Sequence, residues 1–283
     1  MATPLSRRAV LPMLAGLGLA GESSAQSRTW RAGLQLYTVR DLLRADLDGT
    51  LRSVADMGYR EVELPGSDSA DIRAIHEKLK RYGLDVPSLH VGYDGLRSGH
   101  NAALEDALGL GAVFVVCPSI DAGERRTAHD WKVVCQTLGK AGRLVRGQGL
   151  ILAYHNHDFE FVPFADGTTP FDLLIRETDP SDVTLELDVY WAAKAGRDPV
   201  RCLKENAGRI SLVHLKDMAA DGSITEVGAG VLPIEEIVRT ALLAGAKHLF
   251  VEQDDPPDPL RNIRSSLRFL ERLPPDVRPR STL

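Results

Sequence analysis

Residues 150–160, which read LILAYHNHDFE, carry the pattern that decides the fold. The apolar run Leu150–Tyr154 does not alternate with polar residues, which is typical of a strand buried on both faces of a parallel sheet. Polar and ionisable side chains follow this run at once. Eight short runs of this kind occur along the chain: Ala32–Tyr37, Glu61–Leu64, Val86–Val91, Val113–Cys117, Leu150–Tyr154, Val183–Leu187, Ile210–Val213 and His248–Val251.

Helical patterns lie between these runs and end at glycines. An apolar stripe over residues 47–57 stops before Gly58, and further glycines stand where a helix would end before the next strand: Gly83, Gly111, Gly149 and Gly245. Eight such βα units predict a single (β/α)8 TIM barrel. The alternative is an open doubly wound sheet. That fold needs a glycine-rich phosphate turn after its first strand, whereas residues 36–40 read LYTVR.

The first 25 residues have the pattern of a signal peptide. Arg7 and Arg8 precede a short apolar run, Ala9–Ala20, and Ser23-Ser24-Ala25 offers small residues to a signal peptidase. The run is too short to span a bilayer stably. The paired arginines favour the twin-arginine route over an ordinary secretory signal that contains two arginines by chance. We therefore expect residues 1–25 to be removed, and the mature protein to be periplasmic or otherwise exported, without a stable membrane span.

The mature chain would form one domain, with the barrel over residues 26–273 and a flexible tail over 274–283. Loss of two basic residues and one acidic residue with the signal changes the net charge from −5 to −6. An acidic chain without a basic run does not favour nucleic-acid binding. The cysteines are three, Cys117, Cys135 and Cys202, and form no CxxC motif. They predict neither a disulfide framework nor a zinc-thiolate site.

Ionisable side chains collect where the predicted strands end. In a barrel of this type, chemistry occurs at the C-terminal ends of the strands. Runs two and three end in Glu63 and near His90, and the last four runs deliver further groups: His155, His157 and Glu160, then Glu186 and Asp188, then His214 and Lys216, then Glu252. Imidazoles and carboxylates on four successive strands form a mixed nitrogen and oxygen site. Such a site suits Mn²⁺, Co²⁺, Zn²⁺ or iron better than Ca²⁺ or Mg²⁺, although Mg²⁺ stays an alternative.

The chain resembles the xylose isomerase-like barrel superfamily, in its sugar phosphate isomerase/epimerase branch. The stretches that carry the resemblance run from the first strand to the last: Gly33–Arg40, Ala153–Glu160, Leu187–Trp191, His214–Asp217, Glu226–Gly230 and Val251–Asp254. The resemblance implies one divalent metal, held by one residue at the end of each of strands five to eight. In this sequence those residues are His155, Asp188, His214 and Glu252.

Two positions depart from the ketose epimerases of this superfamily. Those enzymes carry a glutamate that also acts as a base where this chain has His155, and a substrate-binding histidine where this chain has Trp191. A two-glutamate epimerase mechanism is therefore in doubt. Glu252, which can bind the metal through one oxygen, or His157 is expected to act as the base. The alternative for His157 is that it only braces its loop.

The remaining polar and aromatic residues at the rim have expected roles at the substrate. Lys216 is expected to stabilise a developing enolate, unless it forms a rim salt bridge to Asp217 or Glu186. The residues expected to contact substrate are Glu63, His90, Trp191, Tyr37 and Glu160. For Glu160 the alternative is simple exposure to solvent, and for the aromatic residues it is plain packing. Gly228-Ala229-Gly230 is expected to cradle a polar group, without a basic residue that would favour phosphate.

The function expected from these features is a metal-dependent sugar isomerase or epimerase. It would abstract a proton next to a carbonyl, on an unphosphorylated sugar or keto-sugar, because exported sugars seldom stay phosphorylated. The alternative is a lyase or hydratase on keto-glycosides or their elimination products, which shares the same enediolate-like intermediate. A metal-dependent endonuclease or a non-catalytic sugar-binding protein is less favoured. The partner is a sugar-like small molecule and not nucleic acid, and an oligomer is left open.

Overall fold

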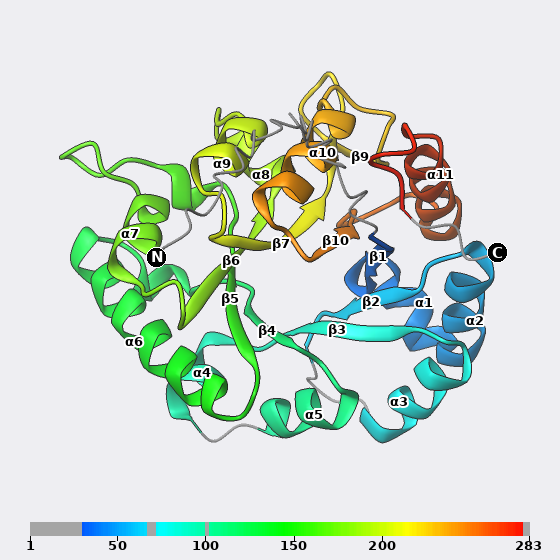
Figure 1. Ribbon diagram of the computed structural model, residues 1–283, viewed down its shortest axis with the longest axis horizontal. Coiled ribbons are helices and arrows are strands. Elements are labelled where there is room, and N and C mark those ends of the chain that lie inside the picture. The colour runs from blue at the N-terminus through cyan, green and yellow to red at the C-terminus, as the bar shows by residue number, and fades with distance from the viewer. Residues whose placement is uncertain (1–29, 67–71, 100–101, 280–283) are drawn as a thin grey trace, which may run out of the picture.

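The computed structural model describes residues 30–66, 72–99 and 102–279, and these form a closed barrel of eight parallel strands (Figure 1). The order around the barrel is β1-β10-β7-β6-β5-β4-β3-β2. The strands are β1 (Ala32–Gln35), β2 (Glu61–Leu64), β3 (Asp85–His90), β4 (Phe114–Cys117), β5 (Ile151–His155), β6 (Val183–Asp188), β7 (Ile210–Leu215) and β10 (His248–Val251). The predicted (β/α)8 barrel is therefore confirmed.

Helices surround the barrel and connect successive strands. The α-helices are α1 (Arg40–Ala45), α2 (Leu47–Met57), α3 (Ile72–Arg81), α4 (Tyr93–Ser98), α5 (Ala102–Leu110), α6 (Ala128–Gly147), α7 (Pro170–Glu177), α8 (Val189–Lys194), α9 (Pro199–Glu205), α10 (Ile234–Ala244) and α11 (Pro259–Glu271). Short 3-10 helices η1 (Leu36–Val39), η2 (Ala122–Glu124) and η3 (Phe159–Phe161), and a small antiparallel pair, β8 (Asp217–Met218) and β9 (Ile224–Thr225), lie in the connections. The described helices include none that is long and apolar enough to cross a membrane.

Local sequence signals explain where these elements begin and end. Helix α2 stops at Gly58, whose φ of 115° is a conformation that a side chain would strain. Helix α6 begins with a capping box in which Thr127 and Asp130 bond to each other's backbone. Several strand boundaries differ from the prediction by one or two residues; at β1, the strand ends at Gln35 and Tyr37 lies in η1. The side chain of Gln35 accepts a bond from the Tyr37 backbone N–H, which turns the chain out of the strand.

An apolar layer crosses the middle of the barrel interior. It is a cluster separate from the main core, made of Phe114, Val116, Ala153, Leu212 and Phe250. Because side chains alternate along a strand, the next inward positions toward the C-terminal ends lie above this cluster. Those positions carry ionisable side chains, which are described below. The main core packs the outer faces of the strands against the helices.

The first and last described segments meet beside β1 and β10. The Trp30 indole donates to the carbonyl of Val277, 2.8 Å away, and only 2% of Val277 is exposed. Arg239 pairs with Asp276. The residues up to 279 thus pack on the barrel, in contrast to the flexible tail expected over 274–283. The signal peptide expected at residues 1–25 lies outside the described part of the chain.

Candidate metal and substrate site

A cluster of ionisable side chains fills the C-terminal end of the barrel. Two cross-strand pairs form its base: His155 lies in register with Glu186, and Asp188 lies in register with His214. Side chains of paired residues on adjacent parallel strands point to the same face, and here that face is the barrel interior. Other strands add Gln35, Glu63, Ser88 and His90, while Lys216, Glu252 and Asp254 stand just beyond β7 and β10. Side chains from these strand ends thus lie together at the C-terminal end of the barrel.

His214 lies between carboxylates on both sides and has no exposed surface. Its Nδ1 atom is 2.8 Å from Glu252 Oε2, and its Nε2 atom is 2.6 Å from Glu63 Oε2. Burial disfavours the imidazolium, but Glu186, Glu252 and Glu63 outweigh this and raise the pKa of His214 well above its usual value. A group in this position attracts a proton or another cation.

Glu186 is a strand-end residue to which the sequence analysis gave no role as a ligand, a base or a substrate contact. Its Oε2 atom lies 3.0 Å from His155 Nδ1, 3.2 Å from His214 Nε2 and 3.4 Å from His90 Nε2. One carboxylate oxygen thus faces three imidazoles from three strands, and Glu186 is fully buried. The signal for it was present, because Glu186 stands two residues before Asp188 and strand side chains repeat with a period of two.

Lys216 is buried among three carboxylates. Its ammonium lies 3.0 Å from Asp188, 2.8 Å from Glu252 and 2.7 Å from Asp254. Burial disfavours the charge, but the three carboxylates raise the pKa of Lys216 well above its usual value. The rim salt bridge to Asp217 or Glu186 considered from the sequence is not formed. Lys216 instead faces two of the expected metal ligands.

The cluster contains more buried negative charge than buried positive charge. Its carboxylates are Glu63, Glu186, Asp188, Glu252 and Asp254, whereas Lys216 is the one lysine paired with them among the described residues. Buried carboxylates require compensating charge. Without a metal, the histidines supply this positive charge. Burial disfavours the imidazolium of His90, but Glu63 and Glu186 outweigh this and raise the pKa of His90 to about 9. A divalent cation would supply the same compensation.

The residues present fit a metal. Donor atoms of Asp188, His214 and Glu252 lie within 4.8 Å of one another, as do those of a second group, His90, His155, Glu186 and His214. His155 Nε2 is 3.9 Å from Asp188 Oδ2, so His155 lies beside the group of Asp188, His214 and Glu252, but neither group contains all four expected ligands. Asp188 Oδ2 and Glu186 Oε1 are buried and accept no hydrogen bond from the described residues, although Lys216 pairs with Asp188. Unsatisfied buried oxygens are available for ligation.

Two buried nitrogen atoms lie beside this cluster without a hydrogen-bond partner among the described residues: His157 Nδ1 and Trp191 Nε1. The two rings are 5.5 Å apart, and His157 is 5.1 Å from His155. Burial, His155 and Lys216 lower the pKa of His157 to about 2, so its ring is neutral. Trp191 offers an N–H, and neutral His157 offers a donor or an acceptor. These atoms are free to bind polar groups of a substrate.

Glu63 and Glu160 have surroundings that suit support better than substrate contact. Glu63 is fully buried and bonds to Gln35, Ser88 and His214. Glu160 is also fully buried. Tyr154 Oη–H donates to one of its oxygens, and the His157 N–H donates to the other. Burial raises the pKa of Glu160 to about 8. Glu160 therefore does not face solvent, which was the alternative considered from the sequence, and its two bonds fix the His157 loop.

Tyr37 and the glycine loop also differ from expectation. Tyr37 is 40% exposed and stacks under the Arg40 guanidinium. The loop at Gly228 and Gly230 does cradle an anion, but the anion is the side chain of Asp217, which accepts bonds from both of these N–H groups and from Leu232. A Cβ at Gly230 would lie 2.2 Å from Asp217 Oδ1. The loop is thus tied to β8, and its N–H groups are occupied by the protein itself.

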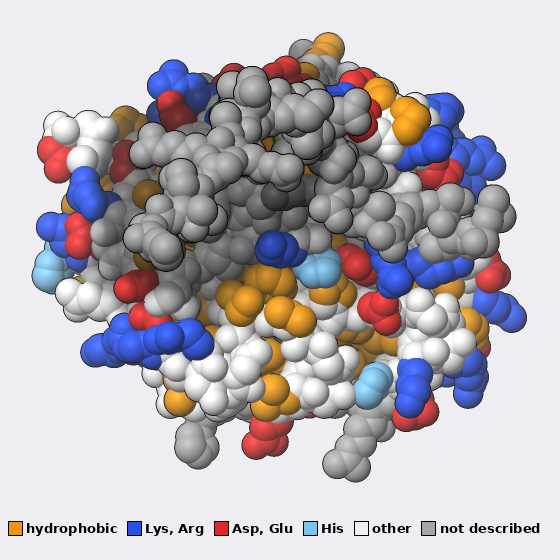
Figure 2. Space-filling model, in the orientation of Figure 1, with side chains coloured by type: hydrophobic (Ala, Val, Ile, Leu, Met, Phe, Trp, Pro, Cys, Tyr) orange, Lys and Arg blue, Asp and Glu red, His pale blue; other side chains and the backbone are white. Residues whose placement is uncertain are grey.

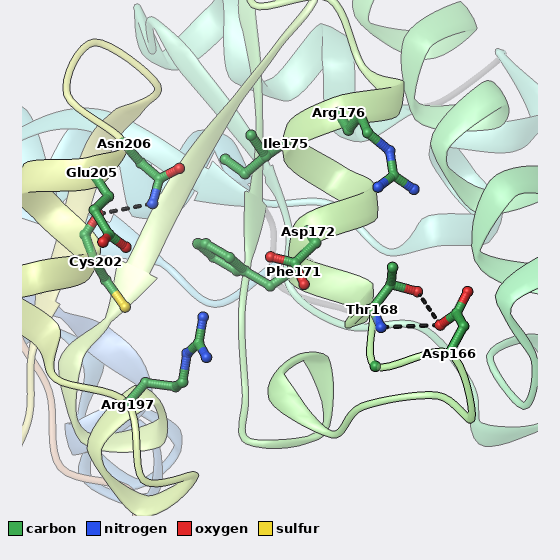
Figure 3. A pocket seen from close by; sticks show the side chains of 11 residues that line it. Asp166, Thr168, Phe171, Asp172, Ile175, Arg176, Arg197, Cys202, Glu205 and Asn206 are labelled. Atoms are coloured by element: carbon green, nitrogen blue, oxygen red, sulfur yellow. Dashed lines mark hydrogen bonds between the residues drawn. The ribbon is translucent and has the colours of Figure 1, made fainter.

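The cavity in Figure 3 lies outside the barrel, between α7 and α9, with a volume of about 490 Å³. It contains Arg176, Arg197 and Asp172 around the ring of Phe171, and none of the residues of the cluster. We therefore place the chemistry at the strand ends. Around the edge of the face in Figure 2, basic and acidic side chains are interspersed.

Comparison with known proteins gives the same fold and names related enzymes. A curated inosose dehydratase of Geobacillus kaustophilus (strain HTA426) is 28% identical over 199 residues, which cover 62% of this chain and 63% of that enzyme. The match therefore spans less than two thirds of that enzyme. A sugar phosphate isomerase/epimerase from Parabacteroides distasonis ATCC 8503 is 25% identical, has a TM-score of 0.77, and is matched over 88% of this chain and 100% of that chain.

A third relative shows the fold alone. The IOLI protein, whose crystal structure has a bound zinc atom, superposes with a TM-score of 0.66 at 13% identity, over 85% of this chain and 96% of that chain. The profile of the xylose isomerase-like TIM barrel family matches residues 51–273. The chain belongs to the xylose isomerase-like TIM barrel family.

Proposed function

We propose that this protein is a metal-dependent lyase of the dehydratase type, which removes water from an unphosphorylated keto-cyclitol or keto-sugar. The observation that carries the proposal is the buried ammonium of Lys216, held within 3.0 Å of Asp188 and Glu252, next to the unpartnered atoms of His157 and Trp191. The inosose dehydratases among the relatives support dehydration over isomerisation. This proposal reverses the preference expected from the sequence.

The metal would be one divalent ion held by His155, Asp188, His214 and Glu252. Two nitrogen and two oxygen donors favour Zn²⁺, Co²⁺ or Mn²⁺ over Mg²⁺. When bound, such an ion polarises a carbonyl and so acidifies the neighbouring C–H bond. Lys216 adds a second positive charge at the same place, and stabilises negative charge that develops on the substrate oxygen.

His157 is proposed as the base. Its free Nδ1 would take the proton from the carbon beside the carbonyl, the β C–O bond would break, and His157 would return that proton to the departing hydroxide as water. A pKa of about 2 keeps the ring neutral, and the acidity that the cations give the substrate offsets its weak basicity. Glu252 is the other candidate, but His214 and Lys216 already occupy its Oε2 atom. Trp191 would donate to a substrate hydroxyl, and His90 lies at the same rim.

The cations near the site have protein partners, which supports an unphosphorylated substrate. Lys216 is surrounded by carboxylates. Arg40 bonds to the Asp254 carbonyl and to Asp255, and Lys194 donates to the Tyr190 hydroxyl. A phosphate would meet the negative cluster without a free cation among these three residues.

The test uses purified protein loaded separately with Zn²⁺, Co²⁺ or Mn²⁺, and offered inosose and 3-keto-glycosides in deuterated water. Dehydration gives a product lighter by one water, and it should fail in metal-free protein. A product of unchanged mass that gains deuterium beside the carbonyl would support isomerase or epimerase activity, which the Parabacteroides distasonis relatives favour as the second candidate. Neither change on any of these substrates would overturn both.

Export is also proposed, from the Arg7-Arg8 pair and the small residues at 23–25. Mass spectrometry of protein from the cell envelope should find an N-terminus near Gln26. An intact N-terminus on protein recovered from the cytoplasm would contradict export.

A further inference from the structure

Glu186 pairs with more imidazoles than either expected carboxylate ligand, Asp188 or Glu252, does. Its Oε2 atom lies 3.0 to 3.4 Å from ring nitrogens of His155, His214 and His90. A carboxylate whose role is to contact substrate or solvent would not need three imidazole neighbours. Its position below Asp188 on β6 separates the cluster into a deep side, toward Glu63 and Glu186, and a rim side, toward Asp188 and Glu252.

Two imidazoles extend from one side of the cluster to the other. His155 points Nδ1 at Glu186 and Nε2 toward Asp188. His214 points Nε2 at Glu63 and Glu186, and Nδ1 at Glu252. A neutral imidazole carries one N–H and one lone pair, so the choice of the protonated nitrogen decides which side can receive a metal.

The arrangement of acceptors favours N–H groups on the deep side. His214 Nε2 faces two carboxylates, at 2.6 and 3.2 Å, whereas Nδ1 faces one, at 2.8 Å. Glu252 already receives the Lys216 ammonium, and so does Asp188. On the deep side, Glu186 receives no lysine or arginine among the described residues, and its bonds come from the histidines.

We propose that Glu186 is a positioning residue that holds the N–H protons of His155 and His214 on the deep side, so that His155 Nε2 and His214 Nδ1 face Asp188 and Glu252 as metal ligands. This inference rests on the metal site of the proposed function. A carboxylate behind a ligating histidine fixes the ring and increases the donor strength of its free nitrogen, and loss of such a partner typically costs about 10- to 100-fold in metal affinity.

The competing arrangement places the metal on the deep side, with His90, His155, Glu186 and His214 as ligands. Glu186 would then be a ligand itself. The two arrangements exclude each other for a single metal, because each of the shared imidazoles offers one lone pair. They also differ in the tautomers they require, which makes the choice measurable.

The experiment compares Glu186→Gln and Glu186→Met with the same substitutions at Glu61. Gln keeps a hydrogen-bond acceptor but removes the charge, whereas Met removes both. Glu61 is a matched control, because its carboxylate also pairs with a histidine, His248 Nδ1 at 2.7 Å, but at the opposite end of the barrel. Metal per chain, the dissociation constant for Zn²⁺, and the protonated nitrogen of each histidine, by long-range ¹H–¹⁵N NMR, are measured for every variant.

The expected result is one metal per chain in wild type, with Nδ1–H on His155 and Nε2–H on His214. Glu186→Gln should weaken Zn²⁺ binding about 10-fold and Glu186→Met about 100-fold, while one Zn²⁺ still binds at saturation. Both Glu61 variants should bind as wild type does. Circular dichroism and the melting temperature establish that each variant is folded, and Glu186→Gln provides the result if Glu186→Met does not fold.

Three outcomes would overturn the inference. Unchanged Zn²⁺ affinity in both Glu186 variants would remove the positioning role. Complete loss of binding at saturation in folded Glu186→Gln, with Nε2–H on His155, would make Glu186 a ligand and place the metal on the deep side. Equal losses of Zn²⁺ affinity in the Glu61 variants would show that removal of any carboxylate charge in the barrel weakens binding. Absence of metal from wild type would instead overturn the proposed function, before the variants are compared.

Discussion

The two ends of the barrel interior contain the same pair of residue types in opposite surroundings. His214 and His248 lie on either side of one ring, Phe250, at centroid distances of 6.1 and 6.2 Å. Each histidine lies beside a glutamate: His214 beside Glu63, and His248 beside Glu61. At the N-terminal end, His248 and Glu61 form one ion pair with partial exposure to solvent. At the C-terminal end, His214 is fully buried among three carboxylates.

The difference shows that the number of buried neighbours, and not the pair itself, makes a cation site. An isolated pair near solvent is compensated by water and contributes little. A group of buried carboxylates has no such compensation, so it retains protons on its histidines or binds a cation. The apolar layer around Phe250 separates the two environments. The proposed metal site is thus confined to one end of the barrel.

The largest expected effect distinguishes the two ends by metal content. His214→Ala should reduce bound metal from one per chain to about a tenth or less, with loss of activity, because it removes a donor that the geometry cannot replace. His248→Ala should keep the metal. Elemental analysis of both variants after equal exposure to Zn²⁺ makes the comparison. Retention of metal by folded His214→Ala would remove His214 from the ligand set.

The next effect concerns charge at the C-terminal end. Lys216→Met should lower kcat/KM by about 100- to 1,000-fold, since it removes the cation that stabilises the developing oxyanion. Metal should bind at least as tightly as in wild type, because Asp188 and Glu252 lose a competing positive charge. Lys194→Met is the control, since Lys194 is bonded to the Tyr190 hydroxyl and not to the carboxylates. Activity near the wild-type value in Lys216→Met would leave Lys216 as a structural counter-charge alone.

A smaller effect is expected in the pH dependence of stability. Burial raises the pKa of Glu160 from 4.5 to about 8. Between these values the unfolded chain has lost this proton while the folded protein retains it, so the free energy of unfolding falls as pH rises through this window. Glu160→Gln should remove this pH dependence. Between pH 5 and pH 8, its free energy of unfolding should rise by roughly 1–3 kcal/mol relative to that of wild type.

Urea unfolding at several pH values measures this difference. The exposed Glu236→Gln variant, whose carboxylate pairs with Lys204 on the surface, is the control and should show no such trend. A constant difference between Glu160→Gln and wild type across the range would mean that Glu160 is ionised in the folded protein. The charged end of the barrel would then contain one more negative group than inferred here.

The smallest effect is expected at the N-terminal end. Glu61→Gln should change the free energy of unfolding by less than about 1 kcal/mol, because solvent screens a partly exposed pair. Thermal or urea unfolding at neutral pH provides the measurement. A decrease of several kcal/mol in the free energy of unfolding would show that His248 depends on Glu61 as strongly as the buried groups depend on one another. It would weaken the contrast between the two ends.

The fold could be read from the sequence because burial on both faces leaves a clear mark. Apolar runs without alternation placed all eight strands, and errors at their starts, such as Val113 and Leu150, are one residue. The site was visible where polar residues end a strand, as at Asp188 and His214. Glu186 was not assigned, because a charge inside a strand shows its role only when three other strands bring histidines to it.

Loop residues were the least predictable. Glu160 and Asp217 are polar residues after strands, which the sequence cannot separate from substrate-binding residues. The structure shows that both turn back to accept bonds from their own loops, Glu160 from the His157 N–H and Asp217 from the Gly228 and Gly230 N–H groups. Such contacts depend on the path of the backbone and leave no periodic pattern.

The pairing of β1 with β10, and the bond from Trp30 to Val277 across 247 residues, have a consequence for how this chain is made. The barrel cannot close on the ribosome until nearly all of the chain has been synthesised. Until then β1 and β7, the two neighbours of β10, each have an open edge that can pair with another chain. Closure of so long a loop is also slow. A chain that stops before β10 would therefore keep an exposed β1 edge and tend to aggregate, and would not form a smaller stable barrel.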